Sequence, residues 1–113
     1  MNRGEVWEIN LDPTIGAEIK KIRPCVVVSR DALSRLPLKI IVPITEWKEN
    51  FAQAAWHVKI EPTSQNGLTK SSSADTYQVR SISDQRFVRR IGALEPAIMD
   101  RIKQGLLISL NIS

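Results

Sequence analysis

The sequence predicts a mainly β protein of the α+β class, in which a small antiparallel barrel or half-open sheet is closed by one C-terminal helix. Two observations lead to this prediction. Short segments with strand-like patterns are separated by turn residues along most of the chain. Only the C-terminal segment changes to the period of a helix. With 113 residues and no repeat, linker or low-complexity tract, the chain is expected to form one domain, 1–113.

The first two strands are predicted from different patterns. Residues 6–11 alternate between apolar and polar side chains, as expected of a strand with one buried face. A loop follows at 12–21, where Asp, Pro and Gly supply turn residues. Residues 25–29 are the next predicted strand, and their apolar run indicates a central position in the sheet. We expect Cys25 to fill space in the core, because a thiol among valines is a poor thiolate.

The next part of the chain contains one further strand. Residues 30–36 predict a short helical turn that Asp31 caps. Residues 38–44 predict the third strand, and Pro43 near its end favours an edge strand or a bulge. The stretch 45–54 is predicted to be a polar loop.

The second half of the chain begins with a clean alternation at 55–61. This pattern places Trp56 in the core and turns His57 toward solvent. Residues 62–73 are rich in Ser, Thr, Gly and Asn and predict a mobile loop. Three elements follow in order: a strand at 74–82, a turn or single helical turn at 83–87 and a strand at 87–94.

The terminal helix is predicted from apolar residues that recur every four positions, namely Ile98, Ile102, Leu106 and Leu110. Pro96 suits the first turn, because proline lacks an N–H group that would be unpaired there. The pattern therefore predicts one amphipathic helix.

The composition narrows the classes of function. Sixteen Lys and Arg against twelve Asp and Glu give a formal net charge of +4. This excess favours an anionic partner, nucleic acid first, although a solvated basic surface explains it equally well. One histidine and one cysteine do not build the usual zinc site, and the chain has neither a Gly-rich phosphate loop nor an acidic cluster suited to two Mg²⁺ ions. We therefore expect no metal and no other cofactor.

The sequence shows no feature that directs it to a membrane. It begins without a secretory signal, and no apolar run approaches the roughly 20 residues that span a bilayer. We therefore expect a cytoplasmic protein without a membrane partner.

Four stretches follow one another in the order and at the spacings of a known family. They are RGEVWEINLDPTIGAEIKKIRPCVVVS at 3–29, VPIT at 42–45, YQVRSIS at 77–83 and RRIGAL at 89–94. The first combines an R-G-E-V-W strand, a D-P-x-x-G-x-E loop and an R-P-x-V-V-V-S strand. Each motif alone is weak, but together they span nearly the whole chain, which resembles the MazF/PemK family of bacterial toxins.

The resemblance implies an SH3-like barrel of the plasmid-maintenance toxin type, usually a homodimer. It also implies an mRNA interferase, that is, a metal-independent endoribonuclease that cleaves single-stranded RNA and is held inactive by a cognate antitoxin. The complex with the antitoxin is then expected to bind operator DNA.

Arg23 is the principal candidate for catalysis. RNA is cleaved without a metal when its 2′-hydroxyl attacks the adjacent phosphate, and the enzyme must then stabilise extra negative charge. A guanidinium stays charged and forks onto phosphate oxygens, and Pro24 restricts Arg23 to an extended backbone. The alternative is a surface arginine paired to a carboxylate. The resemblance points to catalysis.

Two further residues are candidates for the chemical step. The Thr45 hydroxyl would hydrogen-bond a phosphate oxygen, and its alternative is a hydrogen bond to its own backbone. Glu18, in the loop before Arg23, is a candidate for the base that takes the 2′-hydroxyl proton. It is equally a candidate salt-bridge partner for Lys20 or Lys21.

Other side chains are candidates for binding RNA. Gln78 and Arg80 are two positions apart on a predicted strand and therefore face the same side. Gln can read base edges, and Arg can hold a phosphate or stack on a base, although a polar face in contact with water is the alternative. Lys20 and Lys21 are candidate contacts for the RNA backbone, or else ordinary loop lysines.

The three tryptophans are candidate stacking surfaces for bases. Trp7 and Trp56 lie in apolar rows and are expected in the core. Trp47 lies in a polar loop and is the best of the three for a contact with RNA or antitoxin.

Two other functions are compatible with the sequence. The first is a DNA-gyrase poison of the same architecture, which acts by binding a protein, and the second is a non-catalytic nucleic-acid-binding barrel. The combination of Arg23 with Thr45 favours RNA cleavage over gyrase binding. An assay with single-stranded RNA in EDTA distinguishes the three functions.

Overall fold

The computed structural model describes all 113 residues and contains seven strands, four short 3₁₀ helices and one α-helix. The strands are β1 (Glu5–Asn10), β2 (Ile22–Val27), β3 (Leu38–Glu46), β4 (His57–Ile60), β5 (Ser72–Asp75), β6 (Arg80–Ser83) and β7 (Phe87–Ala93). The 3₁₀ helices are η1 (Asp31–Leu33), η2 (Glu49–Gln53), η3 (Thr76–Gln78) and η4 (Asp84–Arg86), and the α-helix is α1 (Pro96–Leu110). None of these helices combines the length and apolar character needed to cross a bilayer.

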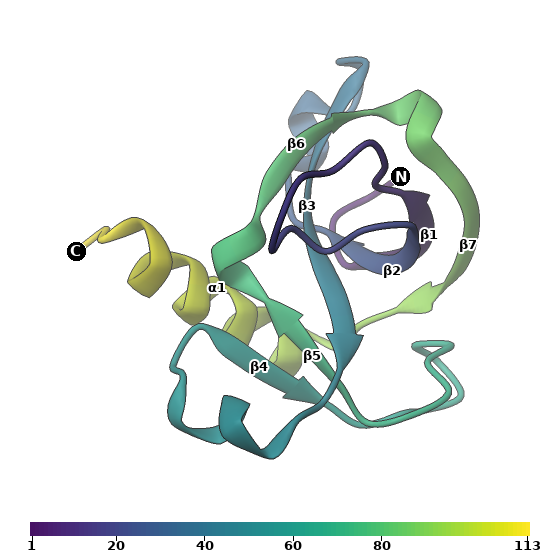
Figure 1. Cartoon of the computed structure of the whole chain (residues 1–113). Helices are drawn as coiled ribbons and strands as arrows, with labels where there is room; N and C mark the ends of the chain where they lie inside the picture. The colour runs from purple at the N-terminus through teal and green to yellow at the C-terminus, as the bar shows by residue number, and fades with distance from the viewer.

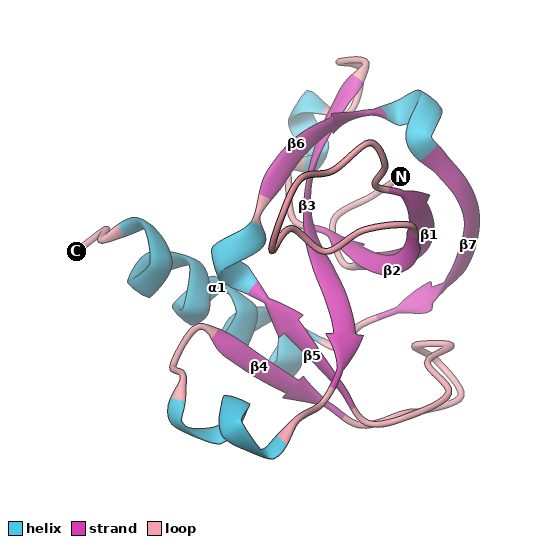
Figure 2. Ribbon diagram, in the orientation of Figure 1, coloured by secondary structure: helices cyan, strands magenta, loops and turns pink.

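The strands form one strongly curved antiparallel sheet. Its order is β4-β5-β3-β2-β1-β7, and β6 pairs with the first part of β3. Figure 1 shows β6 and β7 curving around β1, β2 and β3, while β4 and β5 extend the sheet beside α1. Figure 2 shows that α1 is the only long helix and that the other helical segments are short connections. The predicted mainly β fold with a C-terminal helix is confirmed.

Strand β3 is central, and Pro43 lies neither at an edge nor in a bulge. Residues 38–41 of β3 pair with β6, and residues 44–46 pair with β5. On the opposite side, Pro43 is in register with Cys25 of β2. Pro43 therefore occupies the interval between two successive partners, where the absence of its N–H group breaks no ladder.

The predicted strand at 74–82 is divided by η3. The Asp75 carboxylate accepts a hydrogen bond from the Tyr77 backbone N–H at 3.1 Å, which ends β5 and starts the turn. The Thr76 hydroxyl donates to the Trp56 carbonyl at 2.7 Å and lies 3.0 Å from the Ser109 hydroxyl of α1. The predicted loop at 62–73 also ends early, because its last two serines are buried in β5.

The core consists of two apolar clusters. The larger contains Val26, Ile44, Ile60 and Ile102, so α1 contributes directly to it. The smaller contains Cys25, whose side chain is fully buried as predicted. Loss of solvent on burial raises the pKa of the Cys25 thiol to about 12. This thiol is a packing group rather than a nucleophile at neutral pH.

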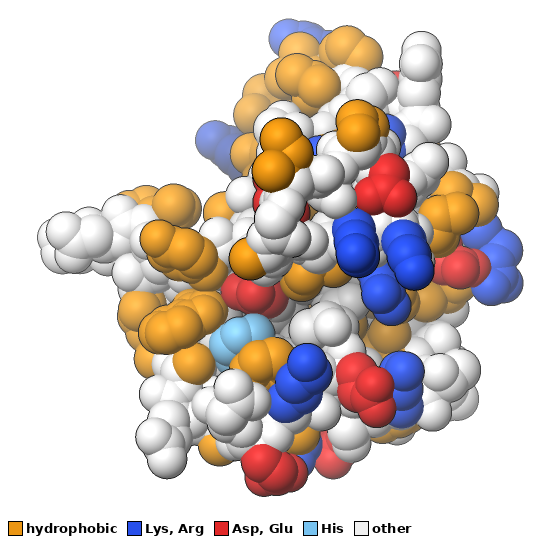
Figure 3. All heavy atoms as spheres, in the orientation of Figure 1, with side chains coloured by type: hydrophobic (Ala, Val, Ile, Leu, Met, Phe, Trp, Pro, Cys, Tyr) orange, Lys and Arg blue, Asp and Glu red, His pale blue; other side chains and the backbone are white.

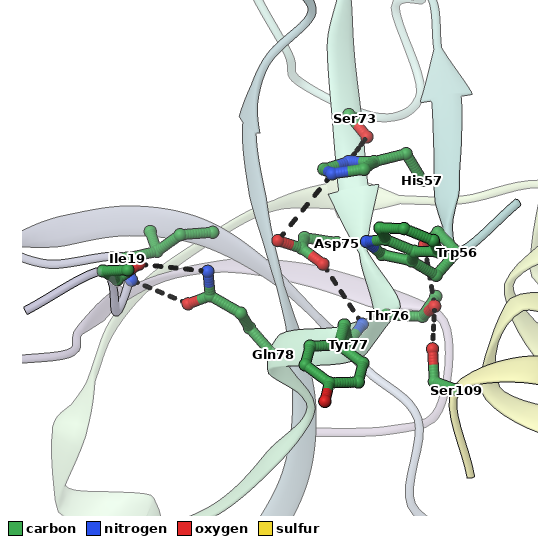
Figure 4. A network of polar contacts seen from close by, with 10 residues as sticks. Ile19, Trp56, His57, Ser73, Asp75, Thr76, Tyr77, Gln78 and Ser109 are labelled. Carbon is green, nitrogen blue, oxygen red and sulfur yellow. Dashed lines mark hydrogen bonds and ion pairs between the residues drawn. The ribbon is translucent and has the colours of Figure 1, made fainter. Parts of the chain in front are cut away.

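Two expectations at the start of β4 are wrong. The Trp56 side chain is 40% exposed, although its position in the alternation predicted burial. The His57 side chain is only 8% exposed, because it stacks on Phe51 of η2 at 3.7 Å and 6°. Its Nδ1 lies 2.7 Å from the Ser73 hydroxyl. Figure 4 shows His57 beside Ser73 and Asp75.

The capping role predicted for Asp31 is also wrong. Arg30 occupies the N-cap position of η1, and no side chain caps this helix. The Asp31 carboxylate instead accepts a hydrogen bond from the Arg3 backbone N–H at 2.7 Å. It therefore ties η1 to the N-terminal segment.

Candidate active site

A surface hollow of about 380 Å³ brings Arg23 and Thr45 together. Its walls come from β1, β2, β7, the end of β3 and the loop before β5. Its charged side chains come from Glu8, Arg23, Glu46, Lys48, Lys70 and Arg89. We call it the Arg23 hollow. Figure 3 shows Lys and Arg side chains gathered on the face that carries the β1–β2 loop and β3, with Asp and Glu side chains among them.

The Arg23 side chain is exposed and belongs to no ion pair. Its Nε donates to the Lys20 carbonyl at 3.1 Å. This bond orients the guanidinium and leaves its two terminal nitrogens for a ligand. The alternative of a surface arginine paired to a carboxylate is therefore wrong.

Thr45 lies inside β3 rather than at its end, because β3 continues to Glu46. Its backbone is in register with Ser73 of β5, so it is fixed by the ladder and not by a flexible loop. The side chain is half-buried and lines the hollow. A strand position of this kind holds a hydroxyl in one place.

The charges of the Arg23 hollow are only partly compensated. Glu8 pairs with Arg89, and Glu46 pairs with Lys70 at 3.4 Å. The other two cations of the hollow, Arg23 and Lys48, belong to no ion pair. The hollow therefore carries a net positive charge that attracts a phosphate.

A second hollow of about 450 Å³ lies beside the first and contains Glu18, Gln78 and Arg80. We call it the Gln78 hollow. Pro43 lines it, whereas the next two residues of β3 line the Arg23 hollow. The two hollows are therefore neighbours along one strand.

Gln78 holds the β1–β2 loop. Its Oε1 accepts a hydrogen bond from the Ile19 backbone N–H at 2.7 Å, and its Nε2 donates to the Ala17 carbonyl at 3.3 Å. Figure 4 shows this amide directed at Ile19. Gln78 belongs to η3 and not to a strand, so the geometric reason given for pairing it with Arg80 is wrong, although both line the same hollow. Arg80 donates to the Leu11 carbonyl at 3.3 Å.

None of the three charged loop candidates, Glu18, Lys20 and Lys21, lines the Arg23 hollow. Glu18 lines the Gln78 hollow only, and its Oε1 accepts a hydrogen bond from the Ile15 backbone N–H at 2.5 Å. It forms no salt bridge with either lysine. Lys20 and Lys21 are exposed, and the Lys21 backbone N–H donates to the Asp12 carboxylate at 3.1 Å. This hydrogen bond is the main reason that the pKa of Asp12 lies below its ordinary value.

Trp47 packs into the protein and lines neither hollow. Its ring meets Phe51 edge-on at 5.8 Å, and the Lys59 ammonium lies 5.0 Å from the ring centroid. Its indole nitrogen is buried without a hydrogen-bond partner. The exposed aromatic side chains are instead Trp56 and Tyr77, whose ring centroids are 6.3 Å apart.

Sequence reasoning missed five charged residues of the Arg23 hollow, namely Glu8, Glu46, Lys48, Lys70 and Arg89. Glu8 and Arg89 lie on strands that are far apart in the sequence and paired in the sheet. Only the strand order would have revealed their proximity. The remaining residues lie in segments that the sequence predicted to be polar loops, where charged side chains are ordinary and do not indicate a site. No group of three or more His, Cys, Asp or Glu side chains is arranged to hold a metal ion.

Comparisons with known proteins identify the family. Residues 2–110 match the family described as PemK-like, MazF-like toxin of type II toxin–antitoxin system. The chain is 30% identical to Endoribonuclease MazF9 of Mycobacterium tuberculosis, in an alignment that covers 99% of this chain and 98% of the relative. It is 32% identical to Endoribonuclease EndoA of Bacillus subtilis, with 99% and 96% covered.

Solved structures share the fold. MazF from Deinococcus radiodurans superposes with a TM-score of 0.82 at 19% identity, covering 99% of this chain and 97% of that chain. An endoribonuclease from a Mycobacterial species, solved in complex with its cognate antitoxin, gives a TM-score of 0.79 at 18% identity, covering 100% and 97%. The family match over residues 2–110 and the two relatives, covered over nearly their whole length, show that this chain belongs to the PemK-like, MazF-like toxins of type II toxin–antitoxin systems.

Proposed function

We propose that this endoribonuclease toxin cleaves single-stranded RNA in the Arg23 hollow, without a divalent metal ion. The observation that carries the proposal is the exposed, unpaired guanidinium of Arg23 in the same hollow as the Thr45 side chain. Such a pair offers a fixed positive charge and a hydroxyl to one phosphate group.

The chemistry follows from the substrate. The 2′-oxygen of the RNA attacks the adjacent phosphorus, the bond to the 5′-oxygen breaks, and the products carry a cyclic phosphate and a 5′-hydroxyl. Arg23 stabilises the charge that develops on the phosphate oxygens, and Thr45 hydrogen-bonds one of them. Both side chains act by position and electrostatics.

The RNA strand extends from the Arg23 hollow into the neighbouring Gln78 hollow. Arg80 there, and the exposed Lys20 and Lys21 on the adjoining loop, contact the RNA backbone and raise affinity without selecting a sequence. Gln78 contributes by shaping the loop, because both atoms of its amide are bonded to it.

The partners follow from the family. Neighbours solved together with an antitoxin support a cognate antitoxin for this chain. We propose operator DNA as a partner of that complex. We also propose a homodimer. The exposed apolar side chains of Ile108, Leu110 and Ile112 at the end of α1 support a surface that a second protein chain covers.

The test is incubation of the purified protein with single-stranded RNA in excess EDTA. Cleavage that leaves 5′-hydroxyl ends and cyclic phosphates supports the proposal, and cleavage that stops in EDTA and returns with Mg²⁺ contradicts its metal-independent mechanism. Intact RNA together with inhibited DNA supercoiling would assign the chain to the gyrase-binding class. If the protein binds RNA but neither cleaves it nor inhibits DNA supercoiling, the chain is a non-catalytic nucleic-acid-binding barrel.

A further inference from the structure

We propose that Glu8 is the base that takes the proton from the 2′-hydroxyl, and that Arg89 positions its carboxylate. This inference rests on the proposed function, because it names a catalytic group for the same reaction. It transfers to Glu8 the role for which the sequence suggested Glu18.

Glu8 lines the Arg23 hollow together with its neighbours on the two adjacent strands. Glu8 of β1 is in register with Pro24 of β2 on one side and with Arg89 of β7 on the other. Side chains opposite each other in antiparallel strands lie on the same face of the sheet. All three residues line the Arg23 hollow, whereas Glu18 lines only the neighbouring one.

The two oxygens of the Glu8 carboxylate have different surroundings. Arg89 approaches Oε1 with two nitrogens, and the hydrogen bond from Nε measures 2.7 Å. No hydrogen bond or ion pair engages Oε2. The carboxylate is thus fixed by one oxygen, while the other is free to accept a proton.

The other carboxylate of the hollow is less suited to this role. Glu46 lies at the outer end of β3, its side chain is 63% exposed, and its Oε2 is taken by Lys70. The Glu8 side chain is 30% exposed. Glu8 is therefore the better shielded carboxylate, and it lies on the continuous sheet that also carries Arg23.

The proton transfer balances as follows. The 2′-hydroxyl gives its proton to Glu8 Oε2 while the 2′-oxygen forms a bond to phosphorus. The bond between phosphorus and the 5′-oxygen breaks, and that oxygen takes a proton from water. The protonated Glu8 then returns its proton to water, so no other reactant is consumed.

The charged groups that face Glu8 define what a test must control. They are Arg89 from β7, Arg23 from β2, and Glu46, Lys48 and Lys70 from the end of β3 and the adjacent loops. A change at Glu8 alters the net charge of the hollow as well as removing a base. A second variant with the same change of charge in the same hollow separates these effects.

The experiment measures RNA cleavage against pH for the wild type and for Glu8→Gln, Glu46→Gln and Glu18→Gln. Glu8→Gln keeps the shape and a partner for Arg89, so the fold and the KM should stay close to wild type. We expect its kcat to fall by about 10²–10⁴-fold. The decline of the wild-type rate toward acidic pH should disappear in this variant and persist in Glu46→Gln.

The positioning role has its own readout. Arg89→Gln should lower kcat with little change in KM, and Arg89→Lys should restore part of the loss, because a lysine holds one carboxylate oxygen less rigidly than the arginine fork. Asp100→Asn, on the exposed side of α1 and outside the Arg23 hollow, makes the same change of charge as Glu8→Gln and should cleave like the wild type.

The following results overturn the inference and leave the proposed function intact. The first is wild-type cleavage that requires Arg23 but proceeds within about threefold of normal in Glu8→Gln. The second is a slow Glu8→Gln variant that keeps the acidic decline, or a Glu18→Gln variant that alone loses it. If the wild type leaves single-stranded RNA intact, the proposed function itself fails.

Discussion

The side-chain amide of Gln78 joins η3 to a loop 59 residues away, because its Oε1 accepts the Ile19 backbone N–H at 2.7 Å. The same loop ends next to Arg23, whose Nε donates to the Lys20 carbonyl at 3.1 Å. The position of the guanidinium therefore depends on a residue of the neighbouring hollow. Gln78 therefore holds the loop on which the orientation of Arg23 depends.

Replacing Gln78 with alanine should release this loop. We expect the free energy of unfolding to fall by about 1–2 kcal/mol, since two hydrogen bonds are lost at a partly exposed position. Amide hydrogen exchange at Ile19 should accelerate, and kcat for RNA cleavage should fall although the residue touches no reacting atom. Unchanged exchange at Ile19 would show that the loop is held by other contacts.

Replacing Arg23 with alanine should abolish most of the cleavage and leave the fold intact. The side chain is exposed, so the thermal midpoint should change little, whereas kcat should fall by about 10²–10³-fold. Arg23→Lys keeps the charge but loses the fork and should recover only part of the rate. Arg101→Ala, an exposed position of α1, is the control that should cleave normally. Equal rates in Arg23→Ala and Arg101→Ala would remove Arg23 from the mechanism.

His57 should make the stability of the protein sensitive to mild acid. Burial lowers the pKa of His57, and the attraction of Asp75 offsets this only in part. The unfolded chain therefore takes up a proton near the ordinary pKa of about 6.5, before the folded chain does, and stability falls as the pH drops below that value. His57 is the only histidine of the chain.

The measurement is the thermal midpoint between pH 7.5 and pH 5.5, for the wild type and for His57→Gln. The wild type should lose stability on acidification, and the variant should show a smaller slope whatever its absolute stability. A wild-type midpoint that rises toward pH 5.5 would mean that the attraction of Asp75 outweighs the burial.

Gly105 fixes the distance between α1 and η3. A Cβ atom added at Gly105 would lie 2.8 Å from Thr76 Cγ2 and 2.9 Å from its hydroxyl. Gly105→Ala should therefore lower the free energy of unfolding by about 1–3 kcal/mol, despite the better helix propensity of alanine. Chemical denaturation measures this loss. Gln104→Ala, the neighbouring exposed position, should leave stability unchanged or raise it slightly, and an equal loss there would point to a general effect on α1.

Local patterns predicted the elements whose environment is regular. The alternation at β1 and the four-residue period of α1 each report one buried face, the apolar run of β2 reports burial on both faces, and all three elements are present. The pairing of Arg23 with Thr45 was also predictable, because each follows a motif with a fixed place in the family. The hollow that contains both supports this expectation.

Other features depend on contacts between distant segments. His57 occupies a polar position of an alternating strand, and only the packing of Phe51 from η2 covers it. In the sequence, Pro43 is a sign of an edge strand. In the structure β3 changes its partner from β6 to β5 at this point, and no sequence pattern marks that change. The meeting of Glu8 with Arg89 requires the order of β1 and β7, which no local pattern encodes.

The burial of Cys25 has a practical consequence for work with this protein. Its sulfur is shielded by the smaller apolar cluster, and it is the sole thiol in the chain. Reagents that alkylate thiolates will therefore pass it by while the molecule is folded. A cysteine introduced on the surface becomes the one attachment point for a fluorophore or a spin label, with no need to remove the natural residue first.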